Sequence, residues 1–296
     1  MQIGEKMDKL LQPQMVEYIM FQKSNPKLNI LGMFNKQNLK GDTHFEFATK
    51  RTNTQDDIMD GILHEPVEVG EGSEYPQVQV RGIQEEVGNT TKIGFEVEFS
   101  EELVKSDKNL AYVQNTLADM GYAMNRAINR FGFQELMNNA TRPDIELGGG
   151  SWAVDGNESI DDDIKKFQRY FKKQSGYSYT LTNMYTSFDS YWGAEDYYDA
   201  TRVNGFDPNN VRNMTLTGIE EFESGLLGLD ANVNSAIWFY NVNNQENILH
   251  DANGSYINVN RFEEDNKHPK SLGFQLTTEL GMAVLEPRSI VYIEGV

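Results

Sequence analysis

The residue types that most often carry chemistry are few in this chain and poorly grouped. The 296-residue sequence has no cysteine, which excludes disulfides, thiolate zinc sites, iron–sulfur clusters and cysteine nucleophiles. Its four histidines lie far apart, and none belongs to an HExxH or similar pair. The glycine clusters at 70–72 and 148–150 lack the following Lys-Ser/Thr of a phosphate-binding loop. We therefore expect no catalytic residue and no bound cofactor.

One segment repeats part of a calcium-binding loop. Asp230, Asn232 and Asn234 have the alternate spacing of the first calcium ligands in such a loop. However, Ser235 stands where glycine is needed, and Asn241 stands where the bidentate glutamate is needed. The pattern is incomplete, so we predict no metal site.

A group of aromatic residues offers the strongest alternative chemistry. Their rings could form a sugar-binding platform, and the nearby Asp189, Glu195 and Asp196 could supply the two carboxylates of a glycosidase. This leaves a carbohydrate-active enzyme or lectin open as an alternative function. We favour amphipathic aromatics that line a subunit interface or the edge of a core. The group comprises Tyr177, Tyr179, Tyr185, Tyr191, Trp192, Tyr197 and Tyr198.

The charge of the chain is strongly acidic and unevenly distributed. Twenty-six basic residues against 45 acidic ones give a net charge of −19, which argues against a protein that wraps nucleic acid. Residues 1–40 carry six lysines and three acids, whereas residues 52–80 carry seven acids and no Lys or Arg. No signal peptide and no run of 18 apolar residues is present, so we expect no membrane association.

The first half of the chain predicts a helix, a long hairpin and a strand. Residues 4–22 can form an amphipathic helix that Pro13 breaks or caps, before an extended arm. Alternating residues predict strands at 44–51 and 77–83 around the acidic stretch, and a clear strand at 92–99. Ser100 is then placed to cap a short helix.

A long helix is predicted over 109–138. Its apolar residues recur every three or four positions and form a single stripe, which we interpret as core. Gly121 and Gly132 leave room for close packing. The stripe comprises Leu110, Val113, Leu117, Met120, Met124, Ile128 and Phe131.

The second half alternates helices and strands after a glycine joint at 148–150. A helix follows Ser159, with acids in its first turn and lysines in its last turn, as the helix dipole favours. A strand is predicted at 177–187 and a helix at 188–200, followed by an irregular excursion at 201–232. Strands are predicted at 235–242 and 255–260. The chain is expected to end in two strands or in one strand bent at Pro287.

Two segments carry a family resemblance. FEVEFSEELVKSDKNLAYVQNTLADMGYAMNRAINRFGFQELM, residues 95–137, resembles the strand and spine helix of tailed-bacteriophage major capsid proteins. MAVLEPRSIVYIEG, residues 282–295, resembles the last strand of that family. The resemblance implies an α+β chain with the Hong Kong 97 fold, which encapsulins share.

The resemblance also implies a division of the chain. It gives an N-terminal arm at 1–42, an extended β-hairpin loop at 43–91, a peripheral domain with the spine helix at 92–150, an axial domain at 151–273, and a closing strand at 274–296 that returns to the peripheral domain. Residues 201–232 would form the loop at the centre of each capsomer.

The implied function is structural. Family members self-assemble as hexamers and pentamers into the icosahedral head shell that encloses dsDNA, so we expect no enzyme. The expected partners are a scaffolding protein, a portal, decoration proteins and DNA bound only non-specifically. The expected location is the virion, assembled in the host bacterial cytoplasm. We expect little proteolytic processing and no covalent crosslink through Lys50. An encapsulin-type compartment shell is the alternative.

The resemblance suggests an assembly contact between oppositely charged residues. An acidic hairpin tip laid over a neighbouring subunit needs basic residues there, and Arg126 and Arg130 on the long helix are candidates. Arg126→Glu is therefore expected to impair assembly while the subunit stays folded. The acidic candidates are Asp56, Asp57, Asp60, Glu65 and Glu68.

Overall fold

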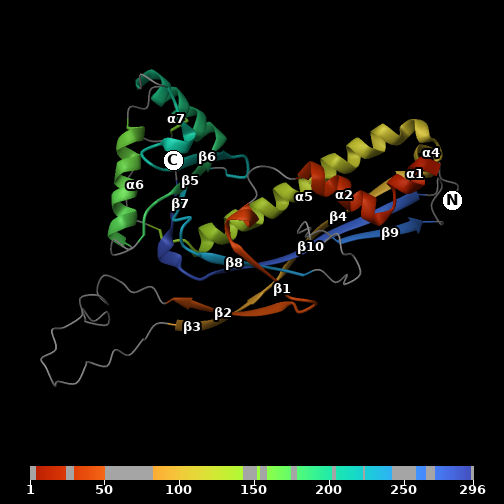
Figure 1. The fold of residues 1–296 in the computed structure, drawn as a ribbon, viewed down its shortest axis with the longest axis horizontal. Coiled ribbons are helices and arrows are strands. Elements are labelled where there is room, and N and C mark those ends of the chain that lie inside the picture. Colours follow the sequence, from red (N-terminus) through yellow and green to blue (C-terminus); the bar gives the residue numbers. More distant parts are fainter. Residues whose placement is uncertain are drawn as a thin grey trace, which may run out of the picture. The chain divides into compact units, whose positions relative to one another are not determined.

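The computed structural model divides the chain into two compact units, each built from separated stretches. Unit 1 comprises Met1–Phe45, Val87–Gln134 and Ile237–Ala283, and unit 2 comprises Glu46–Glu86, Glu135–Ala236 and Val284–Val296. Helices and sheets occur in both, which confirms the α+β class (Figure 1). The residues described below are 5–24, 30–50, 83–142, 152–153, 159–174, 179–201, 205–222, 224–241, 258–264 and 271–294.

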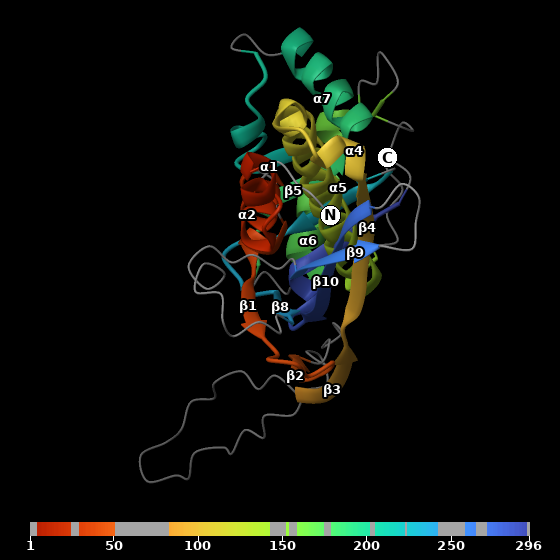
Figure 2. The same ribbon diagram turned by 90° about the vertical axis from the view of Figure 1, so that its right-hand side faces the viewer.

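A five-stranded sheet forms the frame of unit 1. Its strands run in the order β1-β8-β10-β4, and β9 pairs with β10 beside this path (Figure 2). The predicted strand at 92–99 is confirmed as β4, in which Val97 and Phe99 are buried while Glu96 and Glu98 are exposed. The strands are β1 (Asn35–Asn38), β4 (Thr91–Ser100), β8 (Ala236–Tyr240), β9 (Asn258–Glu264) and β10 (Ser271–Val284).

The long helix α5 (Leu110–Asn139) confirms the prediction for 109–138. Its first 25 residues lie in unit 1 and its last five in unit 2, since the boundary follows Gln134. Four positions of the predicted stripe are buried, whereas Leu110, Met120 and Phe131 are half-buried. A Cβ atom on Gly132 would lie 2.5 Å from the Trp238 ring, so the helix approaches its neighbour closely here, as the sequence suggests.

The N-terminal segment is helical, as predicted, and packs against the rest of unit 1. The predicted helix is divided into α1 (Glu5–Leu10) and α2 (Pro13–Ser24), with Pro13 as the first residue of α2. Met7, Leu11 and Val16 are fully buried. The backbone N–H of Met7 also donates to the carboxylate of Asp107 at 3.0 Å, and this bond ties α1 to the start of α5.

The described base of the hairpin consists of β2 (His44–Lys50) and β3 (Ile83–Asn89), which pair as a two-stranded sheet. The first predicted strand is confirmed. The second, at 77–83, lies outside the described residues except for Ile83. The acidic stretch between the strands and the glycine joint at 148–150 also lie outside them.

Unit 2 contains a four-stranded sheet in the order β11-β7-β5-β6. The prediction of an irregular excursion at 201–232 is wrong, because two of these strands lie within it. Both are short: β7 is buried at every position, and β6 alternates over only its first four residues, too few to mark a strand in the sequence. The strands are β5 (Asn183–Ser187), β6 (Thr215–Ile219), β7 (Leu226–Leu229) and β11 (Ile290–Ile293).

Two helices cover one face of this sheet. Helix α6 (Ile160–Gln174) buries its predicted inner residues Ile160, Ile164, Phe167 and Phe171, and α7 (Phe188–Thr201) buries Ala194 and Tyr198. They share a core cluster with Met184, Leu216 and Val291, which the strand register places on one face. Both helices were predicted from the sequence, and both are confirmed.

One local expectation differs from the structure, and one is confirmed. Ser100 occupies the N-cap position of α4 (Glu101–Val104), but its side chain makes no capping hydrogen bond. The closing segment forms two strands joined by η4 (Pro287–Ser289): β10 pairs with β4, whereas β11 pairs with β7 in the other sheet. The turn at Pro287 thus transfers the chain from one sheet to the next.

Candidate assembly surfaces

The two arginines predicted to bind a neighbour lie one turn apart on α5. Arg130 is exposed, whereas Arg126 is half-buried and already has contacts inside the chain. Tyr112 and Tyr122 are exposed by 63% and 47% and occupy the same outward side of the helix as Arg130. The acidic candidates Asp56, Asp57, Asp60, Glu65 and Glu68 lie outside the described residues.

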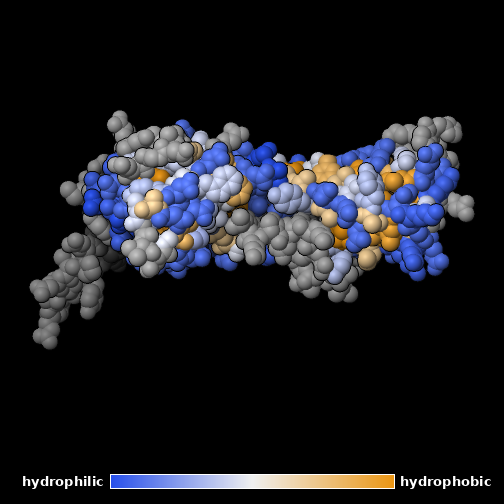
Figure 3. Space-filling view, turned by 90° about the horizontal axis from the view of Figure 1, so that it is seen from above, coloured by the Kyte–Doolittle hydropathy of each residue, from blue (hydrophilic) through white to orange (hydrophobic). Residues whose placement is uncertain are grey.

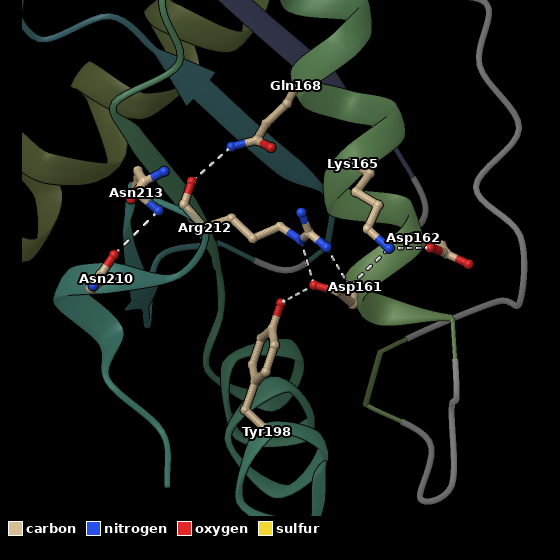
Figure 4. A network of polar contacts seen from close by, with 8 residues as sticks. All are labelled: Asp161, Asp162, Lys165, Gln168, Tyr198, Asn210, Arg212 and Asn213. Carbon is tan, nitrogen blue, oxygen red and sulfur yellow. Dashed lines mark hydrogen bonds and ion pairs between the residues drawn. The ribbon is translucent and has the colours of Figure 1, made fainter. Parts of the chain in front are cut away.

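A polar network in unit 2 joins the start of α6 to a tight turn (Figure 4). Arg212 donates two hydrogen bonds to the Asp161 carboxylate, from Nε at 2.5 Å and from Nη2 at 2.6 Å. The hydroxyl of Tyr198 donates to the same carboxylate at 3.1 Å, and the Lys165 ammonium lies 3.1 Å from it. One carboxylate therefore connects α6, α7 and the turn, in a bidentate geometry that is the strong form of this interaction.

The turn that carries Arg212 has an unusual backbone. Arg212 and Asn213 both have positive φ, 53° and 66°, in a turn closed by two hydrogen bonds between the backbones of Val211 and Met214. Glycine or asparagine normally occupies the first of these positions, since other side chains are strained there. The Gln168 side chain donates to the Arg212 carbonyl at 3.1 Å. The strained turn is thus held in place from α6, and it directs Arg212 at Asp161.

The charges of this network reinforce one another. The hydrogen bonds from Arg212 hold the pKa of Asp161 well below its ordinary value, and Lys165 and Tyr198 lower that pKa further. The same contact raises the pKa of Arg212. Hydrogen bonds to Asp162 and Asp161 raise the pKa of Lys165. All three groups therefore remain charged in the folded protein across the neutral range.

A basic pocket of about 490 Å³ lies beside this network. Four cationic side chains line it, Lys165, Arg169, Lys172 and Arg212, together with Asn213 and other polar or apolar neighbours. The pocket was not predicted from the sequence, although three of the cations recur on α6 at spacings of four and three, the signature of one helix face. Such a concentration of positive charge is notable in a chain of net charge −19.

The aromatic group does not form a sugar-binding platform. Tyr185 and Tyr198 are buried in the core, where burial raises the pKa of Tyr185 to about 12. Tyr179, Tyr191 and Tyr197 are half-buried against the same core, and Tyr177 lies outside the described residues. The favoured interpretation, a core edge, therefore fits five of the seven rings.

The sixth described ring of the group, Trp192, is exposed by 55% on α7. It stacks on Phe188 with ring centroids 5.8 Å apart and an interplanar angle of 14°. Figure 3 shows hydrophilic residues over most of the visible face of the molecule, with smaller hydrophobic patches between them. An exposed pair of large aromatic rings is unusual on such a surface and is typical of an interface.

The calcium-like segment is a hydrogen-bonded turn. One oxygen of the Asp230 carboxylate accepts from the backbone and side-chain nitrogens of Asn232, at 3.0 and 3.1 Å. The other oxygen accepts from the backbone N–H of Thr180 at 2.9 Å. These bonds account for the Asp-x-Asn spacing without an ion. Within the described ranges, no three His, Asp or Glu side chains are grouped to hold a metal.

The family comparison matches most of the chain. A family model described as "Phage capsid protein" matches residues 84–293, which include β4, α5 and nearly all of the elements that follow. The chain belongs to the phage capsid protein family. It is a structural subunit of the capsid shell of tailed phages. A search of curated protein sequences finds no significant match.

Solved structures agree on the fold. A virus-like particle from Pyrococcus furiosus has a TM-score of 0.60 at 9% identity, over 98% of this chain and 100% of that one. The capsid of Cyanophage P-SCSP1u has a TM-score of 0.56 at 10% identity, over 91% and 89%. Mycobacterium phage Che8 has a TM-score of 0.54 at 9% identity, over 90% and 91%. The capsid protein therefore has the Hong Kong 97 fold.

The matched family and the similar structures are all proteins of capsids or particles. Such proteins function by binding one another, so the exposed surfaces of this chain are its candidate functional sites. In the part of the chain that the structure describes, no helix has the length and apolar character needed to cross a bilayer. The candidate surfaces are the outer side of α5, the basic pocket beside α6 and the aromatic pair on α7.

Proposed function

We propose that this capsid protein is the major subunit that self-assembles, as hexamers and pentamers, into the icosahedral head shell of a tailed phage and encloses its dsDNA. The family match over residues 84–293 carries the proposal. The acidic composition supports it, since a wall of net negative subunits repels packaged phosphate and binds DNA only non-specifically. The role is structural rather than enzymatic, and the protein resides in the virion after assembly in the host cytoplasm with scaffolding, portal and decoration proteins.

Electron microscopy of the purified full-length protein, concentrated at neutral pH, tests this proposal. Closed icosahedral shells, or hexamers and pentamers, are the expected result. A persistent monomer would contradict it, and glycan binding by that monomer would favour the lectin alternative. Shells that package host enzymes rather than DNA would favour the encapsulin alternative. The similar fold of the Pyrococcus furiosus particle is the reason to test for it.

We assign the shell roles along the chain as the family order implies. Residues 1–42 form the arm, 43–91 the extended loop, 92–150 the peripheral domain, 151–273 the axial domain and 274–296 the closing segment. The pairing of β2 with β3 supports a hairpin base for the loop, and the 30-residue length of α5 supports its role as the spine helix.

The acidic loop is proposed to bind the outer side of α5 on a neighbouring subunit. The loop has seven acids and no cation over residues 52–80. Arg130 can accept such a segment because it is exposed, and the exposed tyrosines on the same side of α5 add apolar area. Arg126 is a poorer test position than the sequence suggests, since it is half-buried and a substitution there would also disturb the fold.

Arg130→Glu is therefore expected to reduce the yield of assembled particles at least about tenfold, because it places like charges at the proposed contact. The far-UV circular dichroism and melting temperature of the subunit should stay unchanged. Sedimentation velocity separates particles from subunits. Lys108→Glu is the matched control: it makes the same change of charge at an exposed position just before α5 and should assemble normally. Normal particles from Arg130→Glu would refute the contact.

A further inference from the structure

Unit 2 carries two surfaces of opposite charge that its own fold leaves open. The first is the basic pocket beside α6, where Arg169 is exposed and has no ion pair within the described residues. The second is the outer side of α7. That helix contains Asp189, Glu195, Asp196 and Asp199 and no cation, so its four acids give a strongly negative face.

The two surfaces form no ion pair with each other among the residues that the structure describes. Helix α7 buries Ser190, Ala194 and Tyr198 against its own core. Residues two or six positions away on a helix lie on the opposite side, so Trp192 and Asp196 are directed outward, and both are exposed. Neither Asp189 nor Asp196 has a cationic partner among the residues that the structure describes. Both carboxylates are exposed and are therefore open to a cation of a neighbouring subunit.

The α7 surface also has the composition of an interface centre. The stacked rings of Phe188 and Trp192 form an apolar ridge, with Trp192 more than half exposed. Asp189 and Asp196 lie three positions before and four after Trp192, so they flank it on the same helix face. Tryptophan is among the residues that most often dominate binding energy, and a polar rim around it is the usual arrangement.

The basic pocket complements the charge of this ridge. It is a hollow of about 490 Å³ with cations around it, and Arg169 stands at an exposed position of α6. An arginine can stack on a tryptophan face while it pairs with a neighbouring carboxylate. Lys165 and Arg212 are already paired with Asp161, which holds them in the pocket wall and leaves Arg169 to pair with a carboxylate of a neighbour.

We propose that the Phe188–Trp192 ridge of one subunit, with Asp189 and Asp196, docks into the basic pocket beside α6 of the next copy of the same chain. The contact joins two different surfaces of identical subunits, which is the head-to-tail arrangement that generates closed rings. This proposal rests on the proposed shell function. It assigns a specific contact between the unit 2 regions of adjacent subunits in each hexamer or pentamer. The network at Asp161 has a role in this contact, because it holds Arg212 and Lys165 in the pocket wall.

A charge-swap experiment tests the pairing. Arg169→Glu and Asp196→Arg, each alone, should reduce the yield of particles at least about tenfold, because each places like charges at the contact. The double variant restores opposite charges and should recover a yield within about threefold of the wild type. Lys173→Glu, exposed on α6 but outside the pocket, is the matched control and should assemble normally. A normal yield from Arg169→Glu, or no recovery in the double variant, would overturn the proposal.

Disulfide trapping gives an independent result, because the natural chain has no cysteine. A subunit with both Arg169→Cys and Asp196→Cys should form, on oxidation of assembled particles, a ladder of covalent oligomers up to the ring size. Lys173→Cys with Asp196→Cys should not. Intact particles without the ladder would overturn this contact and leave the shell function standing. Failure of the wild type to form any particle would instead overturn the shell function.

Discussion

Replacing Gly193 with alanine is expected to lower the free energy of unfolding by about 3 kcal/mol. A Cβ atom at this position in α7 would collide with the backbone carbonyl oxygen of Trp152. That backbone cannot move aside easily, since the Trp152 side chain is fully buried and its Nε1 donates to the Asp163 carboxylate at 3.3 Å. The effect opposes intrinsic helix propensity, which favours alanine over glycine by about 1 kcal/mol.

Urea denaturation of the unassembled full-length subunit, followed by circular dichroism, measures this loss. Gly32→Ala is the matched control, because no atom lies within 4 Å of a Cβ atom built there. Its stability should change by less than about 1 kcal/mol. If Gly193→Ala proved as stable as the wild type, the contact between α7 and Trp152 could not be as close as the structure has it.

Asp161→Asn is expected to destabilise the subunit by about 2 kcal/mol at neutral pH, the typical contribution of hydrogen bonds to a charged group. The substitution removes the charge that Arg212, Lys165 and Tyr198 share, although the amide keeps the size of the side chain. Arg212 would then stand in a strained turn beside Lys165 without a counter-ion. Loss of this carboxylate should loosen the connection between α6, α7 and the turn.

The pH dependence follows from the lowered pKa of Asp161. In the unfolded chain this carboxyl titrates near pH 3.9, whereas in the folded protein it holds its charge to a lower pH. The carboxylate therefore contributes its full stabilisation above pH 5, and the contribution falls as the pH drops through 4 and below. Urea midpoints measured from pH 7 to pH 3 should show a constant difference between wild type and Asp161→Asn above pH 5, and a shrinking one below pH 4.

Asp162→Asn is the control for this series. It removes the same charge from the same first turn of α6, but Asp162 is exposed and, among the described residues, forms its ion pair with Lys165 alone. Its effect on stability should be small, since exposed ion pairs contribute little. Equal losses from the two variants would mean that the helix dipole, and not the Arg212 contact, supplies the stabilisation.

Periodic segments were the ones that the sequence predicted well. The stripe of α5 repeats over more than 20 residues and the strict alternation of β4 over eight, and both elements form within two residues of the predicted bounds. Helix α6 was predicted from its inner face and from the charges at its ends. Strands β6 and β7 were missed, because β7 is buried at all four positions and the five residues of β6 are too few for an alternation to be detected.

The candidate surfaces were harder to predict. The sequence identified Arg126 and Arg130 but could not distinguish them, and only the packing of α5 decides that Arg130 is the exposed one. The aromatic group was interpreted as lining a subunit interface or the edge of a core, and five of its rings lie in or against the core. Its division into buried tyrosines and one exposed tryptophan depends on how α7 lies on the sheet. The basic pocket lies between α6 and a turn 40 residues further along the chain. No local sequence pattern indicates that these two segments lie side by side.

By itself, the sequence determined the class of this protein: an acidic, cysteine-free α+β chain with no grouped catalytic residues and the strand and spine helix of a phage capsid protein. These properties depend on composition or on short segments of sequence, so they can be predicted before the tertiary structure is known. The tertiary structure alone decided which charges meet. Asp161 pairs with Arg212, which lies 51 positions further along the chain. Helices α6 and α7 and the turn lie together because each buries its apolar side in one core. Their polar sides remain at the surface, where a neighbouring subunit can bind them.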